Sequence, residues 1–291
     1  MRSNDRDEQF RRLAELNADD LLTAFGLTRV GRLQSVLRRL CRVPAERFAH
    51  EIVAYDAAVG QGGLAAGGRL ILQKWRVETT FHGLEHVPAE GPVLLLSNHP
   101  GLSDTLSLFA AIPRTDLRII AAERILLREL PNTLPFLFFA DESVARRQAV
   151  VRAATRHLRQ GGALLTFPAG QIEPDPALHR KEAADSLAAW QGHFEIFLRL
   201  VPNLTVVPII VDGVISPRAQ RNPLTRLRRH KRDRDWLAAT LQVVVRRYQQ
   251  VHVAVTFGAP IRLAEDNNVE VMAEAVLAEA RRIILARRPN A

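Results

Sequence analysis

Lysines, cysteines and long apolar runs are all scarce in this 291-residue sequence. Cys41 is the single cysteine, so no disulfide can form within the chain, and no cluster of cysteines or closely spaced histidines proposes a zinc site. The longest apolar runs, such as Val206 to Val211, are far shorter than the roughly 18 to 20 residues that a membrane-spanning helix needs. We therefore expect no disulfide, no metal site and no transmembrane helix.

The N-terminus also lacks the features of a signal peptide. Met1 to Arg12 carries charges of both signs, and no apolar segment follows it. Hydrophobic residues make up 47% of the chain and charged residues 24%, so neither disorder nor a membrane-embedded bundle is indicated. These features predict a folded cytoplasmic protein.

The positive charge of the chain comes almost entirely from arginine. The net charge is +9, yet only three of the 40 basic residues are lysines, namely Lys74, Lys181 and Lys231. Guanidinium groups suit bidentate contacts with phosphate, although a codon bias of the whole genome gives the same composition. The charge calls for a partner of opposite sign, which is nucleic acid, an anionic membrane surface or an acidic ligand.

Helical periodicity dominates the sequence up to about Trp75. Apolar residues recur at helical spacing in two segments, Phe10 to Leu21 and Val30 to Leu40. Five glycines then cluster before Trp75, which indicates a flexible or tightly packed junction: Gly60, Gly62, Gly63, Gly67 and Gly68. We therefore divide the chain into an N-terminal helical extension, residues 1–75, and a second domain, residues 76–291.

From Val77 onward, short β-type runs alternate with helical stretches. The expected strands are Val77 to Phe81, Val93 to Ser97, Leu117 to Ala121, Phe136 to Ala140, Ala163 to Phe167, Val206 to Val211 and Val251 to Phe257. The expected helices are Thr105 to Ala111, Val144 to Gln160, Ser186 to Leu200, Trp236 to Gln249 and Val269 to Ala286. Apolar strands that alternate with helices indicate an α/β fold, with a largely parallel sheet of about seven strands flanked by helices. In such sheets, ligands bind beyond the carboxyl ends of the strands.

One of these strand ends carries a histidine and an aspartate. The run Val93 to Ser97 leads into Asn98-His99-Pro100-Gly101-Leu102-Ser103-Asp104, where a helix is expected to begin. Across the Pro-Gly turn, Asp104 can accept the N–H of the His99 imidazole, which fixes the tautomer and raises the basicity of the other ring nitrogen. His99 is therefore a candidate general base, although a capping aspartate and a histidine in a turn have the same spacing.

The surroundings of this pair carry a family resemblance. The runs His82-Gly83-Leu84-Glu85-His86-Val87-Pro88, Gly91-Pro92-Val93 and Ser97-Asn98-His99-Pro100 resemble the start of the glycerolipid acyltransferases, a family that includes bacterial lysophosphatidic acid acyltransferases. Three further blocks follow in the family's order: Thr166-Phe167-Pro168-Ala169-Gly170, Val207-Pro208-Ile209-Ile210 and Val255-Thr256-Phe257-Gly258-Ala259-Pro260-Ile261. Four ordered blocks over roughly residues 76 to 285 are more specific than any one of them.

The resemblance implies an O-acyltransferase of phospholipid and lipid metabolism that moves a fatty acyl group directly from an acyl thioester to the hydroxyl of a lipid-like acceptor. His99 would be the general base, assisted by Asp104, and backbone N–H groups of the Ala169-Gly170 turn would stabilise the oxyanion. Acyl-CoA or acyl carrier protein would be the co-substrate, with no further cofactor and no metal. We assign substrate binding to residues of these blocks and their neighbours: Asn98, Arg146, Arg147, Phe167, Pro168, Ala169, Gly170, Glu173 and Pro208.

The sequence departs from the family pattern at two arginines. The arginine expected two residues after Gly170 is Ile172, and the glutamate expected before that glycine is Ala169. The other arginine belongs to an earlier F-I-D-R block of the family. That block is matched best by Phe139-Ala140-Asp141-Glu142, where Glu142 stands at the position of the arginine. The resemblance implies that both arginines bind the phosphate of the acceptor, so both phosphate contacts are missing here.

The charges that follow these positions bear on the acceptor. Glu173 and Asp175 come after Gly170, where the family is positive, and Arg146 and Arg147 are the candidate substitutes for the missing arginines. A carboxylate near a bound phosphate opposes its binding. We therefore expect an acceptor with a neutral, zwitterionic or amine-bearing head group.

Three other functions fit parts of the sequence. A serine hydrolase is disfavoured because no Gly-x-Ser-x-Gly elbow occurs and Ser103 suits a helix cap. A metal site of His99, Asp104 and Glu173 matches no standard ligand spacing. A non-enzymatic protein could bind a membrane or nucleic acid through the arginine-rich segment from Pro217 to Arg247, but no nucleic-acid-binding motif appears. We expect an enzyme peripheral to the inner face of the cell membrane, with an anionic membrane surface as a partner and no nucleic acid.

Overall fold

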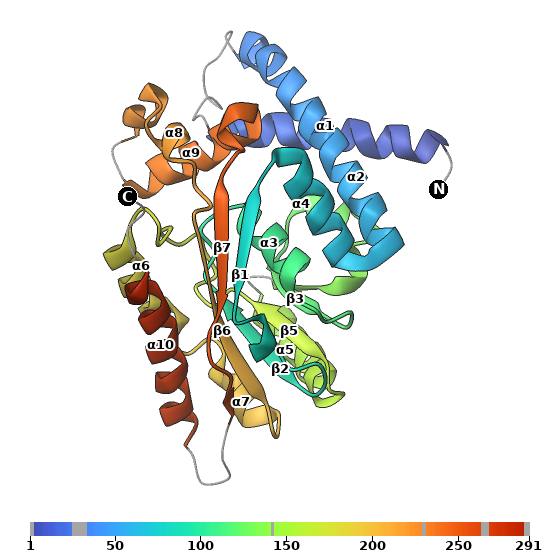
Figure 1. The fold of residues 1–291 in the computed structure, drawn as a ribbon. Coiled ribbons are helices and arrows are strands. Elements are labelled where there is room, and N and C mark those ends of the chain that lie inside the picture. The colour runs from blue at the N-terminus through green and yellow to red at the C-terminus, as the bar shows by residue number, and fades with distance from the viewer. Residues whose placement is uncertain (1–2, 25–33, 141–142, 229–230, 263–267, 288–291) are drawn as a thin grey trace. The chain divides into compact units, whose positions relative to one another are not determined.

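The computed structural model describes residues 3–24, 34–140, 143–228, 231–262 and 268–287 (Figure 1). The chain divides into two compact units. The α/β unit consists of Glu78–Glu123, Phe136–Val214 and His252–Ala291, and the helical unit consists of Met1–Val77, Arg124–Pro135 and Ile215–Val251. Our division at residue 76 left the last two segments of the helical unit in the second domain, because a helical pattern does not show which unit a helix packs against.

The α/β unit is built on a sheet in which β6, β2, β5, β3 and β4 are parallel neighbours (Figure 1). Within the described residues the sheet has eight strands, in the order β1-β7-β6-β2-β5-β3-β4, with β8 paired to β6. All residues of β2 and β6 are buried, so both faces of the sheet's centre are covered, which explains apolar runs without a polar face. The predicted α/β fold is confirmed. The strands are β1 (Glu78–His82), β2 (Val93–Ser97), β3 (Arg118–Ala122), β4 (Leu137–Ala140), β5 (Ala163–Thr166), β6 (Thr205–Asp212), β7 (His252–Phe257) and β8 (Ile261–Arg262).

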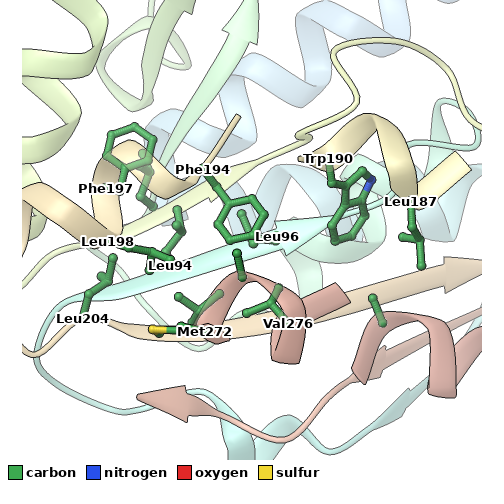
Figure 2. Packing of buried hydrophobic residues seen from close by; sticks show 14 of the residues in the cluster. Leu94, Leu96, Leu187, Trp190, Phe194, Phe197, Leu198, Leu204, Met272 and Val276 are labelled. Atoms are coloured by element: carbon green, nitrogen blue, oxygen red, sulfur yellow. The ribbon is translucent and has the colours of Figure 1, made fainter. Parts of the chain in front are cut away.

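Helices α5, α6, α7 and α10 supply the core on one face of this sheet (Figure 2). Leu94 and Leu96 of β2 point into it, together with the fully buried Trp190 and Phe194. Burying a large apolar side chain stabilises the fold by about 1.5–3 kcal/mol. The helices of the unit are α3 (Ser103–Ala111), α5 (Val144–Arg159), α6 (Arg180–Ser186), α7 (Glu195–Leu200) and α10 (Val269–Ala286), with short 3-10 helices η2 (Leu84–His86), η4 (Leu187–Trp190) and η3 (Leu134–Phe136), which crosses into the helical unit.

The α/β unit differs from the sequence-based expectation in two places. β7 runs antiparallel to β6, and the short strand β8, which the sequence analysis missed, does so too. The expected helix from Ser186 to Leu200 is broken into the end of α6, then η4 and α7. Gly192 between them has φ +79°, a left-handed conformation that no helix continues through.

The helical unit contains a long helix, α2 (Gln34–Trp75), which contacts α1 (Ser3–Ala24). The glycines expected to form a junction lie inside α2, where Gly62 and Gly63 depart from helical geometry and kink it. A Cβ at Gly67 would lie 2.7 Å from the Tyr55 ring, so this glycine allows close packing. The other helices of the unit are α4 (Ile125–Arg128), α8 (Pro217–Gln220), η5 (Pro223–Leu227), α9 (Lys231–Val244) and η6 (Arg246–Tyr248).

Polar contacts join the separate segments of the helical unit. Asp56 of α2 is 2% exposed and accepts hydrogen bonds from the backbone N–H and side chain of both Asn132 and Thr133, at 2.7–3.2 Å. Arg47 donates to the carbonyls of Val243 and Val244 at the end of α9. The helical unit is therefore assembled from three stretches of sequence. Among the described residues, no helix is long and apolar enough to span a bilayer.

Candidate active site

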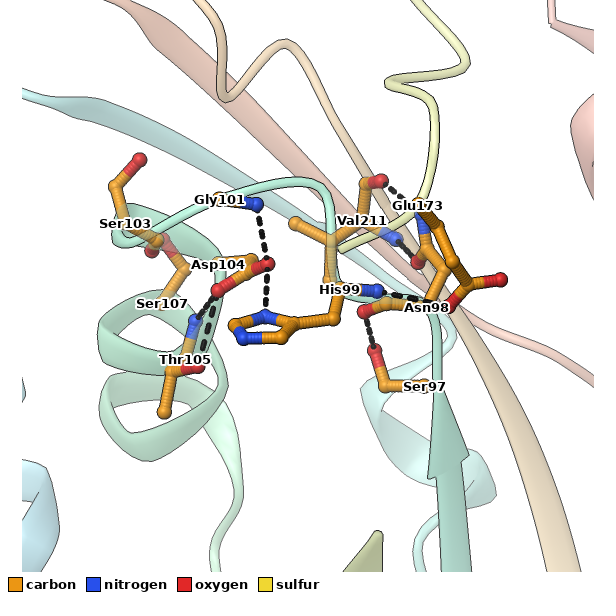
Figure 3. A network of polar contacts seen from close by, with 10 residues as sticks. All are labelled: Ser97, Asn98, His99, Gly101, Ser103, Asp104, Thr105, Ser107, Glu173 and Val211. Atoms are coloured by element: carbon orange, nitrogen blue, oxygen red, sulfur yellow. Dashed lines mark hydrogen bonds and ion pairs between the residues drawn. The ribbon is translucent and has the colours of Figure 1, made fainter. Parts of the chain in front are cut away.

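The strand β2 and the loop after it place His99 at the carboxyl edge of the sheet (Figure 3). Asn98 extends the pairing of β2 with β6 through its side chain: its Nδ2 donates to the Val211 carbonyl at 2.8 Å, and its Oδ1 accepts the Val211 N–H at 2.7 Å. Asn98 is buried and both halves of its amide are used. Its side chain therefore anchors the loop to β6, and it does not present a free group to a substrate.

His99 and Asp104 form a hydrogen-bonded pair (Figure 3). The Nδ1 of His99 lies 2.8 Å from the Oδ2 of Asp104, and the imidazole is 29% exposed whereas Asp104 is fully buried. Among the described residues, no partner contacts the Nε2 of His99. The pair has the arrangement expected from the sequence, with one ring nitrogen held by a carboxylate and the other available to a ligand.

The carboxylate of Asp104 is fixed by donors from its own loop and helix. Its Oδ2 also accepts the Gly101 N–H at 2.9 Å, and its Oδ1 accepts the N–H and the hydroxyl of Thr105. Asp104 lies in the first turn of α3, where a negative charge is favoured by the helix dipole. The cap position itself is Leu102, so neither Ser103 nor Asp104 is the N-cap. This network leaves Asp104 little freedom, and it therefore orients the imidazole.

The electrostatics of the pair favour a charged imidazole. Burial lowers the pKa of His99, but the charge of Asp104, its hydrogen bond and the charge of Glu173 together outweigh burial and raise the pKa above the ordinary value of 6.5. A raised pKa makes the neutral imidazole a stronger proton acceptor. The same shift means that more base is held in its inactive, protonated form at neutral pH.

The turn after β5 lies beside His99. The ring of Phe167 is tilted against the imidazole, with ring centroids 4.6 Å apart, and Gly170 has φ +62°, the left-handed conformation that glycine favours. The N–H of Gly170 donates to the Phe167 carbonyl at 3.0 Å, which closes the turn. We expected the Gly170 N–H to stabilise an oxyanion, but it already donates within the turn. In the described part of the chain the N–H of Ala169 has no such partner.

Three of the expected substrate-binding residues lie on elements other than the His99 loop and the turn after β5. Pro208 lies in the middle of β6, where its ring faces Gly258 and its carbonyl accepts the Gly258 N–H at 2.8 Å. Arg146 and Arg147 lie at the start of α5, after β4, which is three strands from β2. Strands are spaced about 4.8 Å apart, so β4 lies roughly 14 Å across the sheet from β2. Arg146 pairs there with Glu123 at 3.6 Å.

Glu173 also has surroundings that the sequence analysis did not foresee. Its side chain is buried and contacts Trp190, Ser186 and the backbone N–H of His99. We had expected Glu173 to face the acceptor, but its side chain points into the core instead. Glu142, the other carboxylate of that argument, lies outside the described residues. Pro168 follows Phe167 in the turn.

Comparison with known proteins shows which family the sequence around this site resembles. Residues 78–212 match the family model described as Acyltransferase, and this range includes His99, Asp104, Phe167 and Glu173. This part of the chain, just under half of its length, is therefore similar to the acyltransferase family. Among solved structures the chain is similar to the 1-acyl-sn-glycerophosphate acyltransferase PlsC from Thermotoga maritima, with 13% identity and a TM-score of 0.41 over 98% of this chain and 97% of that one. No curated protein matches the sequence.

A cavity of about 540 Å³ lies apart from the His99 pair. Its lining comes from β1, β7, α10 and the end of β6, and it includes His82, His252, Arg282 and Arg287. Arg282 makes two hydrogen bonds with Glu279, and Arg287 pairs with Asp212. Both arginines of the cavity are thus matched by carboxylates, and neither His99 nor Asp104 lines it.

Sequence reasoning missed the residues that support His99 and its loop from behind. Thr105, Ser186 and Trp190 carry no motif, and the contacts of Ser186 and Trp190 with Glu173 span 13 and 17 residues. The one available signal was Glu173 itself, a carboxylate between Ile172 and Pro174 in a proline-rich loop. In the described ranges no three His, Cys, Asp or Glu side chains are grouped as metal ligands.

Proposed function

We propose that this acyltransferase moves a fatty acyl group from an acyl thioester to the hydroxyl of a lipid-like acceptor, with His99 as general base. The observation that supports this most is the His99–Asp104 pair at the carboxyl edge of the sheet, in which Nε2 has no partner within the part of the chain that the structure describes. Acyl-CoA and acyl carrier protein remain the two candidate donors, and both present the same thioester.

The proposed reaction is a direct transfer in two steps. The Nε2 of His99 takes the proton of the acceptor hydroxyl while its oxygen forms a bond to the thioester carbonyl carbon, which gives a tetrahedral oxyanion. The oxyanion then collapses, the carbon–sulfur bond breaks, and the leaving thiolate takes the proton back from the imidazolium. Asp104 keeps the Nδ1–H in place and stabilises the positive charge that forms on the ring.

The oxyanion needs a donor close to the imidazole. The Ala169 N–H is the candidate, because Phe167 brings its turn against His99 and because the neighbouring Gly170 N–H is used within the turn. The side chain of Ala169 packs against the core behind the site, which fixes the direction of the turn.

The acceptor proposal rests on the missing arginines alone, since Glu173 is turned inward. Ile172 cannot bind a phosphate, and Arg146 is paired with Glu123. We therefore propose an acceptor whose head group is neutral, zwitterionic or amine-bearing. A contact of Arg146 or Arg147 with a phosphate of the acceptor would overturn this proposal.

We also propose that the protein works at an anionic membrane surface on the cytoplasmic side. The helical unit contains 25 of the 40 lysines and arginines but only 12 of the 31 acidic residues, so its formal charge is +13 and that of the α/β unit is −4. A separate basic unit can bind anionic lipid while the weakly acidic unit holds the reaction site.

Purified protein assayed with one acyl thioester and a panel of acceptors tests this function. We expect an acylated lipid product by mass spectrometry, with neutral or amine-bearing lyso-lipids preferred over lysophosphatidic acid. Preferred use of lysophosphatidic acid, lost in Arg146→Ala or Arg147→Ala, would overturn the head-group proposal only. No product with any acceptor, together with tight binding of duplex DNA, would instead favour the binding protein that the arginine-rich segment first suggested.

A further inference from the structure

Glu173 holds both backbone polar groups of His99 (Figure 3). Its Oε2 accepts the His99 N–H at 3.1 Å, and its own N–H donates to the His99 carbonyl at 2.9 Å. These two bonds resemble one rung of a sheet, except that a side chain supplies the acceptor. They fix the peptide planes on both sides of His99, and therefore the direction in which its side chain leaves the loop.

The far side of the Glu173 carboxylate is anchored in the core. Its Oε1 accepts the indole N–H of Trp190 at 3.0 Å and lies 3.2 Å from the hydroxyl of Ser186. Trp190 is fully buried and packs among the helices behind the sheet (Figure 2). The position of the His99 backbone is thereby tied to rigid helical elements.

Both protonation states of Glu173 find partners in this network. The ionised carboxylate accepts from Trp190, Ser186 and His99. When protonated, its Oε1–H can donate to the Ser186 oxygen, whose own hydroxyl then donates to the Ala183 carbonyl at 2.8 Å. Burial raises the pKa of the Glu173 carboxyl to about 7, so both states are populated near neutral pH.

We propose that Glu173 is a positioning residue of the acyltransferase site, which holds the His99 backbone in place and whose charge favours the imidazolium. This rests on the proposed role of His99 as general base. His99 has two carboxylates acting on it, Asp104 at Nδ1 and Glu173 beneath its backbone. Glu173 thus connects the backbone of His99 to the helical core through Trp190 and Ser186, and its charge acts on the imidazole.

Glutamine cannot reproduce this arrangement. If its carbonyl oxygen accepts the His99 N–H, its NH₂ meets the indole N–H of Trp190, and in the flipped orientation the NH₂ meets the His99 N–H instead. Glu173→Gln therefore removes the charge and sets two donors against each other. Replacing Trp190 by Phe as well removes that conflict but does not restore the charge.

The matched control is Asp175→Asn. Asp175 is a second fully buried carboxylate two residues further along the same loop, and its Oδ1 accepts the N–H groups of Ala177 and Gly213. It is not among the groups that act on the pKa of His99. Asp175→Asn should reduce the stability of the loop without changing the titration of His99.

The experiment has two readouts. The first is the titration of the His99 imidazole by NMR, with the signal assigned by its absence in His99→Ala. The second is the pH profile of acyl transfer. In Glu173→Gln we expect a lower pKa of His99, an acid limb of kcat/KM shifted to lower pH, and a kcat reduced about ten-fold or more with little change in KM. In Glu173→Gln/Trp190→Phe, the shift of the pKa should persist although the opposed donors are gone.

Two results separate this inference from the function on which it rests. An unchanged pKa of His99 in both Glu173 variants, or an equal shift in Asp175→Asn, would overturn the positioning role even if His99→Ala is inactive. A shifted pKa together with full activity of His99→Ala would leave the link between Glu173 and His99 in place and overturn the general-base mechanism. A uniform loss of rate without a shift of the profile would mean that Glu173 is structural only.

Discussion

At the scale of single residues, a buried carboxyl group should make the stability of the α/β unit depend on pH. Burial raises the pKa of Glu173 from 4.5 to about 7, although hydrogen bonds from Trp190, His99 and Ser186 oppose this shift. Because the folded-state pKa is raised, the stabilising contribution of Glu173 is fully present below about pH 4.5 and is lost as the pH rises through 7. The loss amounts to roughly 3 kcal/mol.

Chemical denaturation of wild type and Glu173→Gln at several pH values measures this effect. From pH 5 to pH 8 the free energy of unfolding of wild type should fall relative to that of Glu173→Gln. His99 adds a change of the same sign, because its pKa is also raised. A difference that stays constant over this range would show that Glu173 does not titrate there.

Residue types were readable from the sequence, but side-chain directions were not. The bond between His99 and Asp104 was predictable because five residues across a turn leave few alternatives. The inward direction of Glu173 was not, since it depends on Trp190 and Ser186, which become neighbours only when the loop folds onto η4 and α6. The same holds for Asn98, whose partner Val211 lies 113 residues away.

At the scale of elements, the apolar pattern located strands well where both faces are buried. The bounds of β2 and α10 agree with the sequence-based ranges, because a buried strand and an amphipathic helix each have one dominant periodicity. The range from Ser186 to Leu200 failed because apolar residues continue at helical spacing across Gly192, where the backbone turns away. The strand β8 is two residues long, too short to carry a pattern.

The segment 124–135 depends on a single carboxylate of α2. Four hydrogen bonds from Asn132 and Thr133 converge on Asp56, which is 2% exposed. Asp56→Ala leaves the buried N–H and hydroxyl of Thr133 without an acceptor and removes the two contacts of the exposed Asn132, so we expect a loss of about 2–4 kcal/mol in the free energy of unfolding. Urea denaturation monitored by circular dichroism measures it.

The control for Asp56 is a partly exposed carboxylate of the same helix. Glu46 pairs with Arg42 at the surface, and Glu46→Gln should change stability little, because exposed ion pairs are screened by solvent. Equal effects of Asp56→Ala and Glu46→Gln would contradict the role of Asp56 as the anchor of this segment.

At the scale of the whole molecule, charge is separated between the two units, and this should make lipid binding depend on salt. Arg218, Arg221 and Arg226 are exposed in the helical unit, where Leu224 and Trp236 are exposed apolar side chains. Each basic residue near an anionic surface contributes about 1 kcal/mol. The arginines before α2, Arg29 and Arg32, lie outside the described residues.

Vesicle sedimentation at low and high ionic strength tests this separation. Replacing Arg218, Arg221 and Arg226 by Gln should weaken binding to anionic vesicles, whereas the same change at the exposed Arg152, Arg156 and Arg199 of the α/β unit should not. Equal loss in the two triple variants, equal binding to neutral and anionic vesicles, or no binding at all would contradict a membrane role for the helical unit.

The central claim is that His99, oriented by Asp104, is the base for acyl transfer, and the rate of acyl transfer by His99→Ala tests it most directly. Purified wild type, His99→Ala and Asp104→Asn are compared at saturating acyl thioester and the best acceptor, with folding checked by circular dichroism. Loss of a general base typically costs about a hundred- to ten-thousand-fold. The account predicts a loss of this size in His99→Ala and a large but smaller loss in Asp104→Asn, whereas near-normal turnover of folded His99→Ala would contradict it.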